Sequence, residues 1–329
     1  MKKLKEPVNR RVQLFMFYKD LGSTRIKVSF IGFGALTLSK LQKNLSLKQS
    51  RYLLDAAIDY GINFFDTSEF YDNYSHLAYL SKTNKDVVIV SKSYAYTKDG
   101  ARKSVHKALH ELERDYIDIF CLHEQESQLT LKGHTEALEE LYKMKKEGLI
   151  RAIGMSTHFI QGVKAATINP YIEVVQAIVN KYGVGIVDGS MDEMNNALKD
   201  LKSRKKGIYA MKVLGGGSLY KDVKSSFNFI KNYNYIDSFA LGIGDISELD
   251  FAIKYLINNI EDKELVRKTT NIKRKLYISD WCMGCGACLN KCSQKALKIK
   301  DNKAIVDSSK CILCGYCVGV CPQLAIKIF

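Results

Sequence analysis

The apolar residues of this chain fall into two kinds of segment that alternate along it. Short runs rich in β-branched and aromatic residues predict strands, and longer segments with apolar residues at every third or fourth position predict amphipathic helices. The predicted strands cover residues 30–34, 62–66, 87–91, 117–122, 151–155, 174–178, 208–211 and 238–242. The predicted helices cover residues 47–60, 75–81, 101–114, 135–147, 161–166, 190–202, 223–233 and 247–259.

This alternation predicts an α/β protein with a parallel sheet, because parallel strands need a helical crossover between them. Repetition of βα units over about 240 residues favours a closed (β/α)8 TIM barrel, and an open doubly wound sheet is the alternative. Apolar runs at residues 15–18 and 26–29 flank Gly22-Ser23-Thr24. They predict an N-terminal β-hairpin that closes the bottom of the barrel.

The distribution of cysteine divides the chain into two domains. Eight of the nine cysteines lie between Cys282 and Cys321. Residues 261–274 before them are charged and poor in large apolar side chains, which is typical of a linker. The sequence therefore predicts a tail at residues 1–14, a barrel at 15–260, a linker at 261–274 and a small α+β domain at 275–329.

Charge and hydropathy exclude several classes of protein. The chain of 329 residues has 50 basic and 35 acidic residues, a net charge of +15, but its lysines are spread along its whole length. This distribution favours a solvated surface over a nucleic-acid site, which needs a clustered basic patch. No apolar run approaches the roughly 18 residues that span a bilayer. We therefore expect a cytoplasmic protein without a membrane span or a nucleic-acid partner.

The cysteines of the small domain repeat one spacing, C-x2-C-x2-C-x3-C. Three thiolates at intervals of three residues can wrap three corners of an iron–sulfur cube, and the fourth lies too far along the chain for the same cube. Zinc sites more often use paired C-x2-C knuckles, and a chain with one other cysteine does not suggest a disulfide framework. The motifs are Cys282, Cys285, Cys288 and Cys292, then Cys311, Cys314, Cys317 and Cys321, the last followed by Pro322.

This segment resembles the bacterial two-cluster ferredoxins, in which the fourth cysteine of each motif ligates the other cluster. The resemblance implies two [4Fe-4S] clusters. One would be held by Cys282, Cys285, Cys288 and Cys321, and the other by Cys311, Cys314, Cys317 and Cys292. We also expect a hairpin between residues 296–300 and 304–307, and pairing of residues 325–329 with 276–279.

Three consecutive predicted strands end on a titratable residue, and barrel enzymes place their active sites at the carboxyl ends of their strands. These residues are Asp66, Lys92 and His123, and Tyr71 follows five positions after Asp66. Residues 61–68 with Tyr71, 90–92 and 115–123 resemble the signatures of the aldo-keto reductases in sequence order, and the similarity extends over residues 18–260.

The resemblance implies catalytic roles for Asp66, Tyr71, Lys92 and His123. In that family a reduced nicotinamide gives hydride to a carbonyl carbon while the tyrosine protonates the oxygen. Tyrosine has a reference pKa of about 10, and lowering it to near 7 takes about 4 kcal/mol. Lys92, held by Asp66, is expected to lower the pKa of Tyr71, and His123 is expected to orient the carbonyl.

The resemblance also implies a set of nicotinamide-cofactor contacts. Thr157 replaces the usual asparagine, and Met211 replaces the aromatic residue that many relatives carry. No arginine lies between residues 238 and 253, so the sequence does not choose between NADP(H) and NAD(H). The implied contacts are Ser156, Thr157, Gln176, Met211, Lys212, Leu214, Gly215, Gly244 and Ser247.

The two halves handle electrons differently, because a nicotinamide delivers a pair as hydride and a cluster moves one at a time. The favoured hypothesis is a reductase of an aldehyde, ketone or quinone whose clusters exchange electrons with a redox partner such as a ferredoxin, flavodoxin or flavoprotein. The alternative is a nucleotide-binding redox sensor or partner-docking module with little turnover. A third hypothesis, a dedicated electron carrier, leaves the barrel's titratable residues without a use.

Overall fold

The computed structural model describes residues 16–84 and 86–329, so the predicted tail at residues 1–14 lies outside the described residues. Eight parallel strands form a closed barrel, as predicted, in the order β10-β3-β4-β5-β6-β7-β8-β9. The barrel strands are β3 (Ile31–Gly34), β4 (Phe64–Asp66), β5 (Val88–Ser93), β6 (Ile117–Leu122), β7 (Ile150–Thr157), β8 (Val174–Ile178), β9 (Gly207–Met211) and β10 (Ser238–Leu241).

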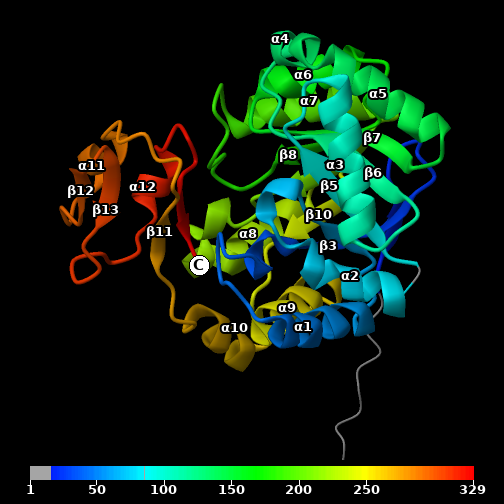
Figure 1. Cartoon of the computed structure of the whole chain (residues 1–329). Helices are drawn as coiled ribbons and strands as arrows, with labels where there is room; N and C mark the ends of the chain where they lie inside the picture. The colour runs from blue at the N-terminus through cyan, green and yellow to red at the C-terminus, as the bar shows by residue number, and fades with distance from the viewer. Residues whose placement is uncertain (1–15, 85) are drawn as a thin grey trace, which may run out of the picture.

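Helices surround the barrel (Figure 1). Serine caps begin several of them, and Ser46 and Ser190 each form a reciprocal capping box with the residue three positions on. The short helix α4 was not predicted. The helices are α1 (Leu47–Asp59), α2 (Tyr74–Thr83), α3 (Lys98–Glu111), α4 (Gln128–Gly133), α5 (Thr135–Lys146), α6 (Ile160–Ile168), α7 (Met191–Ser203), α8 (Val223–Lys231) and α9 (Ile246–Ala252).

The predicted N-terminal hairpin consists of β1 (Tyr18–Asp20) and β2 (Lys27–Ser29), which pair antiparallel. Its side chains Leu21, Ile26 and Val28 are fully or almost fully buried in one apolar cluster with inward-facing residues of the barrel strands. Burial of this apolar surface favours a barrel that is filled at this end rather than open.

The segment expected to be a linker contains helix α10 (Lys263–Thr270). The side chain of Asp262 accepts a hydrogen bond of 2.9 Å from the backbone N–H of Leu265, which caps the helix. Leu265 is buried and belongs to the main core cluster. With so few apolar residues the helix gives a weak periodic signal, and packing against the barrel stabilises it.

The C-terminal domain contains two small antiparallel sheets, as expected. Strand β11 (Leu276–Ile278) pairs with β14 (Ile326–Ile328), and β12 (Leu297–Lys300) pairs with β13 (Lys303–Val306). The helices α11 (Ala287–Lys291) and α12 (Tyr316–Gly319) each begin after a glycine in the left-handed conformation. In each cysteine motif, this glycine lets the backbone turn between the second and third cysteines.

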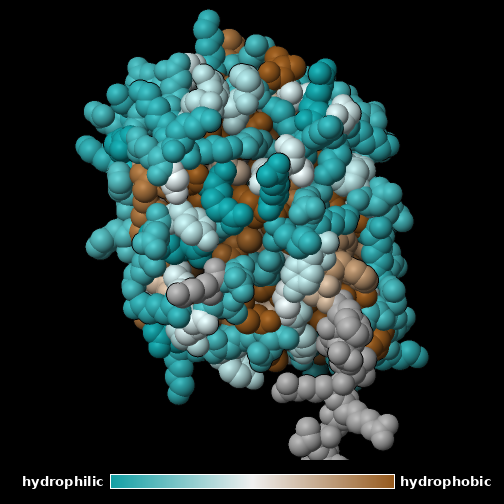
Figure 2. Space-filling model, turned by 90° about the vertical axis from the view of Figure 1, so that its right-hand side faces the viewer, coloured by the Kyte–Doolittle hydropathy of each residue, from teal (hydrophilic) through white to brown (hydrophobic). Residues whose placement is uncertain are grey.

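The C-terminal domain packs against the loops at the barrel mouth (Figure 1). Gly217, after β9, has φ +90°, and its Cα faces β14 so closely that a Cβ atom there would lie 1.7 Å from the carbonyl oxygen of Ile328. Gly315 faces Ser218 in the same way, with a Cβ–Cβ distance of 2.8 Å for an added methyl group. The face turned away from this domain is mainly hydrophilic, with scattered apolar side chains (Figure 2).

We predict that Gly217→Ala weakens the packing of β14 against the loop that follows β9. The added methyl group overlaps the backbone at Ile328, and the positive φ costs a non-glycine residue about 1–2 kcal/mol. If this cost lowers the free energy of local opening of β14, amide hydrogens at Ile326–Ile328 should exchange roughly 10-fold faster. Gly133→Ala is the control, because an added Cβ there meets nothing within 4 Å. Equal exchange of β14 in the two variants would contradict this account of the interface.

No helix in the part of the chain that the structure describes is long and apolar enough to cross a membrane.

Candidate active site

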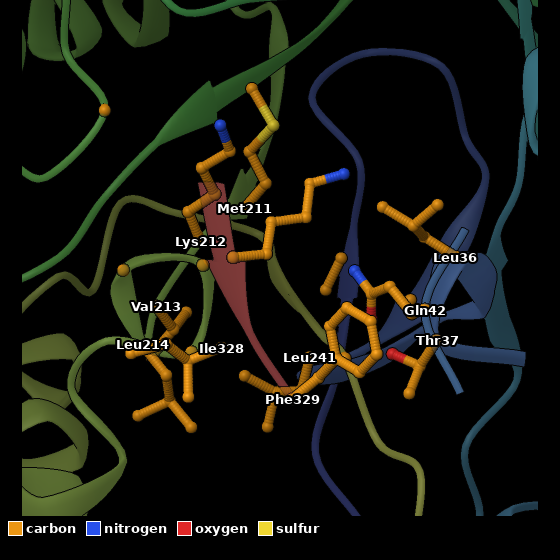
Figure 3. A pocket seen from close by; sticks show the side chains of 18 of the residues that line it. Leu36, Thr37, Gln42, Met211, Lys212, Val213, Leu214, Leu241, Ile328 and Phe329 are labelled. Atoms are coloured by element: carbon orange, nitrogen blue, oxygen red, sulfur yellow. The ribbon is translucent and has the colours of Figure 1, made fainter. Parts of the chain in front are cut away.

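A pocket of about 530 Å³ lies between the mouth of the barrel and the C-terminal domain. Figure 3 shows one side of it, where Met211 and Lys212 follow β9, Thr37 and Gln42 lie opposite, and Phe329 projects between them. The barrel supplies its floor, and the last strand of the chain supplies part of its wall. The cavity is therefore made jointly by the two domains.

The predicted lysine and aspartate form a buried ion pair on the floor of the barrel mouth. Lys92 is fully buried, and its Nζ lies 2.8 Å from Asp66 Oδ2 and 2.8 Å from the carbonyl oxygen of Thr67. The hydroxyl of Tyr209 donates a hydrogen bond of 2.9 Å to Asp66 Oδ1. A buried charge pair needs such extra hydrogen bonds to offset the loss of water. Sequence reasoning missed Tyr209, whose only signal is a hydroxyl on the inward face of β9.

Tyr71 and His123 lie over this ion pair. The ammonium of Lys92 is 5.1 Å from the centre of the Tyr71 ring, and the rings of Tyr71 and His123 meet edge to face at 5.8 Å. The structure thus brings together all four residues for which the sequence implies catalytic roles. Tyr71, His123 and Asp66 line the pocket, and Lys92 supports them from below.

The expected pKa of Tyr71 is wrong in direction. Burial raises the pKa of Tyr71 well above its usual value, and the negative charge of Asp66 raises it further. Lys92 does not reverse this, because its charge is balanced by Asp66 within the same cluster. Tyr71 is therefore protonated at neutral pH, the form that can donate a proton to a carbonyl oxygen.

His123 is held as a neutral imidazole. Its Nδ1 lies 3.1 Å from the Ser68 hydroxyl, and the ring of Tyr94 stacks on it at 4.5 Å. Burial lowers the pKa of His123 well below its usual value, and the nearby charge of Lys92 lowers it further. A neutral ring fixed on one face can hydrogen-bond a substrate oxygen without adding a charge to the site.

These two shifts predict how carbonyl reduction depends on pH. Tyr71 loses its proton only above its raised pKa, and His123 gains one only below its lowered pKa. Between pH 6 and pH 9 both groups keep the protonation state that reduction needs. We expect kcat/KM for an uncharged aldehyde to vary less than about threefold over this range, measured in buffers of constant ionic strength. A falling limb with a midpoint near pH 7 would instead indicate the lowered tyrosine pKa of the sequence-based hypothesis.

Most of the implied cofactor contacts line the pocket, and three do not. The hydroxyl of Thr157 accepts a hydrogen bond of 2.9 Å from Phe159 N–H and lies against Gly162 of α6, outside the lining. Gly244 and Ser247 also lie outside it, although Glu248 beside them contributes to the wall. The contacts that line the pocket are Ser156, Gln176, Met211, Lys212, Leu214 and Gly215.

The glycines after β9 serve the contact between the domains as well as the pocket. Gly215, Gly216 and Gly217 all have positive φ, at 56°, 65° and 90°. All three line the pocket, so backbone N–H groups could approach a cofactor phosphate there. Gly217 is also the residue that lets β14 approach.

The thiols around two cysteines bear on the implied ligation. Burial and the thiols of Cys314, Cys288 and Cys311 raise the pKa of Cys317 to about 12, and of these Cys288 is implied for the other cluster. The thiols closest in electrostatic effect to Cys288 are those of Cys321, Cys282 and Cys285, and together with burial they raise its pKa. Cysteine sulfurs accept backbone N–H groups at 3.2 to 3.4 Å, from Ala296 to Cys292, from Ala304 to Cys282 and from Ala325 to Cys321. Such hydrogen bonds stabilise ligating thiolates.

Within residues 16–84 and 86–329, no three side chains of His, Cys, Asp or Glu are placed to share a single metal ion.

Comparison with known proteins identifies the class of both halves. Residues 30–248 match the model of the aldo/keto reductase family, and residues 281–325 match that of the 4Fe-4S dicluster domain. The chain belongs to the aldo/keto reductase family. Its C-terminal end matches an iron–sulfur domain of the 4Fe-4S dicluster type.

Individual relatives are distant. The chain is 28% identical over 221 residues to L-galactose dehydrogenase of Arabidopsis thaliana, covering 61% of this chain and 66% of that protein. It is 30% identical over 155 residues to the uncharacterized oxidoreductase YqkF of Bacillus subtilis, covering 42% of this chain and 48% of that one. The match thus spans less than two thirds of either relative. An aldo-keto reductase from Bacillus halodurans in its holo form has the same fold, with a TM-score of 0.62 and 17% identity over 78% of this chain and 96% of that chain.

Proposed function

We propose that the barrel reduces a carbonyl compound with NADP(H) or NAD(H), and that two [4Fe-4S] clusters in the C-terminal domain exchange electrons with a redox protein. One observation carries the first part. The protonated Tyr71 and the neutral His123 share one pocket with Ser156, Gln176 and Met211, where the family resemblance puts the nicotinamide.

The residues of the site then have separate tasks. A bound reduced nicotinamide supplies hydride to the carbonyl carbon. His123 donates a hydrogen bond that orients the carbonyl oxygen, and Tyr71 transfers its proton to that oxygen as negative charge develops. Lys92, fixed by Asp66, lies under the ring of Tyr71 and holds that ring in position.

Either nicotinamide cofactor could be accommodated at the outer end of the pocket. Glu248 accepts a hydrogen bond of 2.7 Å from Arg274 and lies 3.7 Å from the ammonium of Lys43. A carboxylate can bind the ribose 2′-hydroxyl of NAD(H), and two cations can bind the 2′-phosphate of NADP(H). The ratio of kcat/KM values for the two cofactors measures which of these the protein uses.

The cluster domain has the surface expected of an electron exchanger. Cys285 and Cys314 are exposed, so the clusters they are proposed to ligate lie near solvent. Three large apolar side chains inside the motifs are exposed by more than half, namely Met283, Ile312 and Tyr316. Exposed apolar residues beside a cluster suit a transient protein contact. On this basis we propose a ferredoxin, flavodoxin or flavoprotein as the partner.

Anaerobic mixing tests both parts in one experiment. Cluster-loaded protein is mixed with NADPH and, separately, NADH, and nicotinamide absorbance and cluster EPR are followed together. We expect oxidation of the nicotinamide only after an aldehyde, ketone or quinone is added, and cluster reduction only by a one-electron donor such as reduced ferredoxin. A chain that turns over no carbonyl with either cofactor would refute the proposal.

One observation favours the alternative of a redox sensor. Strand β14, which belongs to the cluster domain, supplies part of the pocket wall. A change in the clusters could therefore alter nucleotide binding without turnover. In that case Tyr71→Phe would leave the biological response intact, whereas the reductase requires that hydroxyl.

A further inference from the structure

The C-terminal domain contributes a cation, Lys327, to the pocket. Lys327 projects from β14 over the ring of Trp281, with its Nζ 4.8 Å from the ring centre. Trp281 in turn meets Phe70, the neighbour of Tyr71, edge to face at 5.7 Å. This series of contacts links Lys327 to the segment that carries Tyr71, and all four residues line the same pocket.

A second lysine approaches the same region from the barrel. Lys212 follows β9 with φ +57°, and its side chain runs past Gly185, where an added Cβ would lie 3.4 Å from Lys212 Cδ. Burial lowers the pKa of Lys327 to about 8 and that of Lys212 to about 7, and the charge of Lys327 further lowers that of Lys212. The two ammonium groups are therefore close enough to repel each other.

Neither ammonium has a hydrogen-bond or ion-pair partner among the described residues. The negative charge of Glu124 raises the pKa of both lysines. Its Oε2 already accepts a hydrogen bond of 2.6 Å from Tyr94, and its Oε1 lies 3.8 Å from His158. Deeper in the site, Lys92 and Asp66 balance each other. This part of the pocket thus carries more positive than negative charge. The positive charges belong to the ammonium groups of Lys212 and Lys327, which are desolvated by burial.

We propose that Lys327 and Lys212 form a subsite for the carboxylate of the substrate, so that the reductase acts on carbonyl compounds that carry an anionic group. The inference rests on the proposed function, because it assigns a substrate class to the same site. The carbonyl would lie at Tyr71 and His123, and the two carboxylate oxygens would accept hydrogen bonds from the two ammonium groups. The barrel alone lacks Lys327, so the cluster domain completes the specificity of the enzyme.

Matched substrate pairs test the subsite. The cluster-loaded full chain is assayed anaerobically with 4-carboxybenzaldehyde against 4-methylbenzaldehyde, and with 4-oxobutanoate against butanal. Hydrogen bonds to charged groups predict a kcat/KM roughly 10–100-fold higher for the anionic member of at least one pair. Lys327→Met should remove most of that preference while changing the uncharged aldehydes less than about threefold, and Lys327→Arg should retain part of it.

The control variant is Lys298→Met, on an exposed position of β12 in the same domain, which should keep the full preference. Cofactor phosphates are the other anions in the site, so the dissociation constants of NADPH and NADH are measured as well and should not change in Lys327→Met. Equal kcat/KM values within both pairs, or a parallel loss for charged and uncharged aldehydes in Lys327→Met, would overturn the subsite. A weaker cofactor with unchanged substrate preference would assign the lysines to phosphate instead.

Binding separates this inference from the proposed function. If no aldehyde is reduced, the proposed function fails, and calorimetry of 4-oxobutanoate and butanal with the unreactive Tyr71→Phe protein still tests the subsite. Tighter binding of 4-oxobutanoate that is lost when Lys327→Met is added would support an anion subsite without catalysis. Equal binding of both compounds would refute it.

Discussion

Tyr71→Phe is expected to lower kcat for carbonyl reduction by about 10²- to 10⁴-fold, the range that a positioned general acid contributes. The change removes one oxygen atom and keeps the ring that packs against His123 and over Lys92. The dissociation constant of the nicotinamide cofactor should stay within about twofold, because only the transition state uses the proton. Steady-state kinetics and a fluorescence titration of cofactor measure the two quantities.

The matched control for this variant is Tyr94→Phe. Tyr94 also lines the pocket and stacks on His123, but its hydroxyl is engaged with Glu124 at 2.6 Å rather than free for a substrate. Its loss should lower kcat far less, by about tenfold at most, through the orientation of His123. Equal losses in the two variants would assign the proton transfer elsewhere, and His123 would be the next candidate.

The barrel was predictable because its signal is local and repeated. Each buried strand is a short apolar run and each helix has its own period, so the alternation alone indicates a parallel, closed sheet. The elements that were missed or misread, α4 and α10, are short helices with few apolar residues. Leu265 in α10 is buried because the helix packs against the rest of the barrel. The residues of 261–274 contain no periodic apolar pattern from which that contact could be predicted.

The grouping of the proposed catalytic residues was predictable for a related reason. The carboxyl ends of neighbouring strands must meet, so Asp66, Lys92 and His123 had to lie near one another once the barrel was recognised. The pKa of Tyr71 was not predictable, since it depends on how much water reaches the hydroxyl and on how completely Asp66 balances Lys92. Both are properties of packing in three dimensions.

The part of the pocket wall that the C-terminal domain supplies could not be predicted from sequence patterns. Trp281 and Lys327 are more than 200 residues after Tyr71, and only the docking of the cluster domain brings them to the pocket. A signal existed in Gly215, Gly216 and Gly217, of which the family resemblance implied only Gly215, as a cofactor contact. Three successive glycines with positive φ also permit the close approach of another strand, and here Gly217 meets β14. The same residues therefore support two contacts, of which the sequence suggested one.

The proposed ligation predicts which cysteine variants share a phenotype. Each [4Fe-4S] cluster contains four iron atoms, so loss of one ligand set should remove about half of the iron of a two-cluster domain. If the fourth cysteines cross over, Cys321→Ser and Cys282→Ser lose the same cluster and leave the same EPR spectrum after reduction by dithionite. By the same logic, Cys292→Ser and Cys311→Ser leave the other spectrum. Local ligation would instead pair Cys292→Ser with Cys282→Ser.

For one of the two clusters the proposed crossed pairing has support, because Cys321 of the second motif is among the thiols that raise the pKa of Cys288 of the first. Cys121→Ser is the control for iron content, since this buried thiol belongs to the barrel and burial raises its pKa to about 12, which keeps it protonated. Its iron should stay at the level of the unchanged protein. Because β14 begins five residues after Cys321, loss of that ligand should also speed amide exchange in β14, whereas Cys311→Ser should affect it less. If the cluster is lost and amide exchange in β14 does not change, contacts with the barrel are sufficient to keep β14 in place at the pocket.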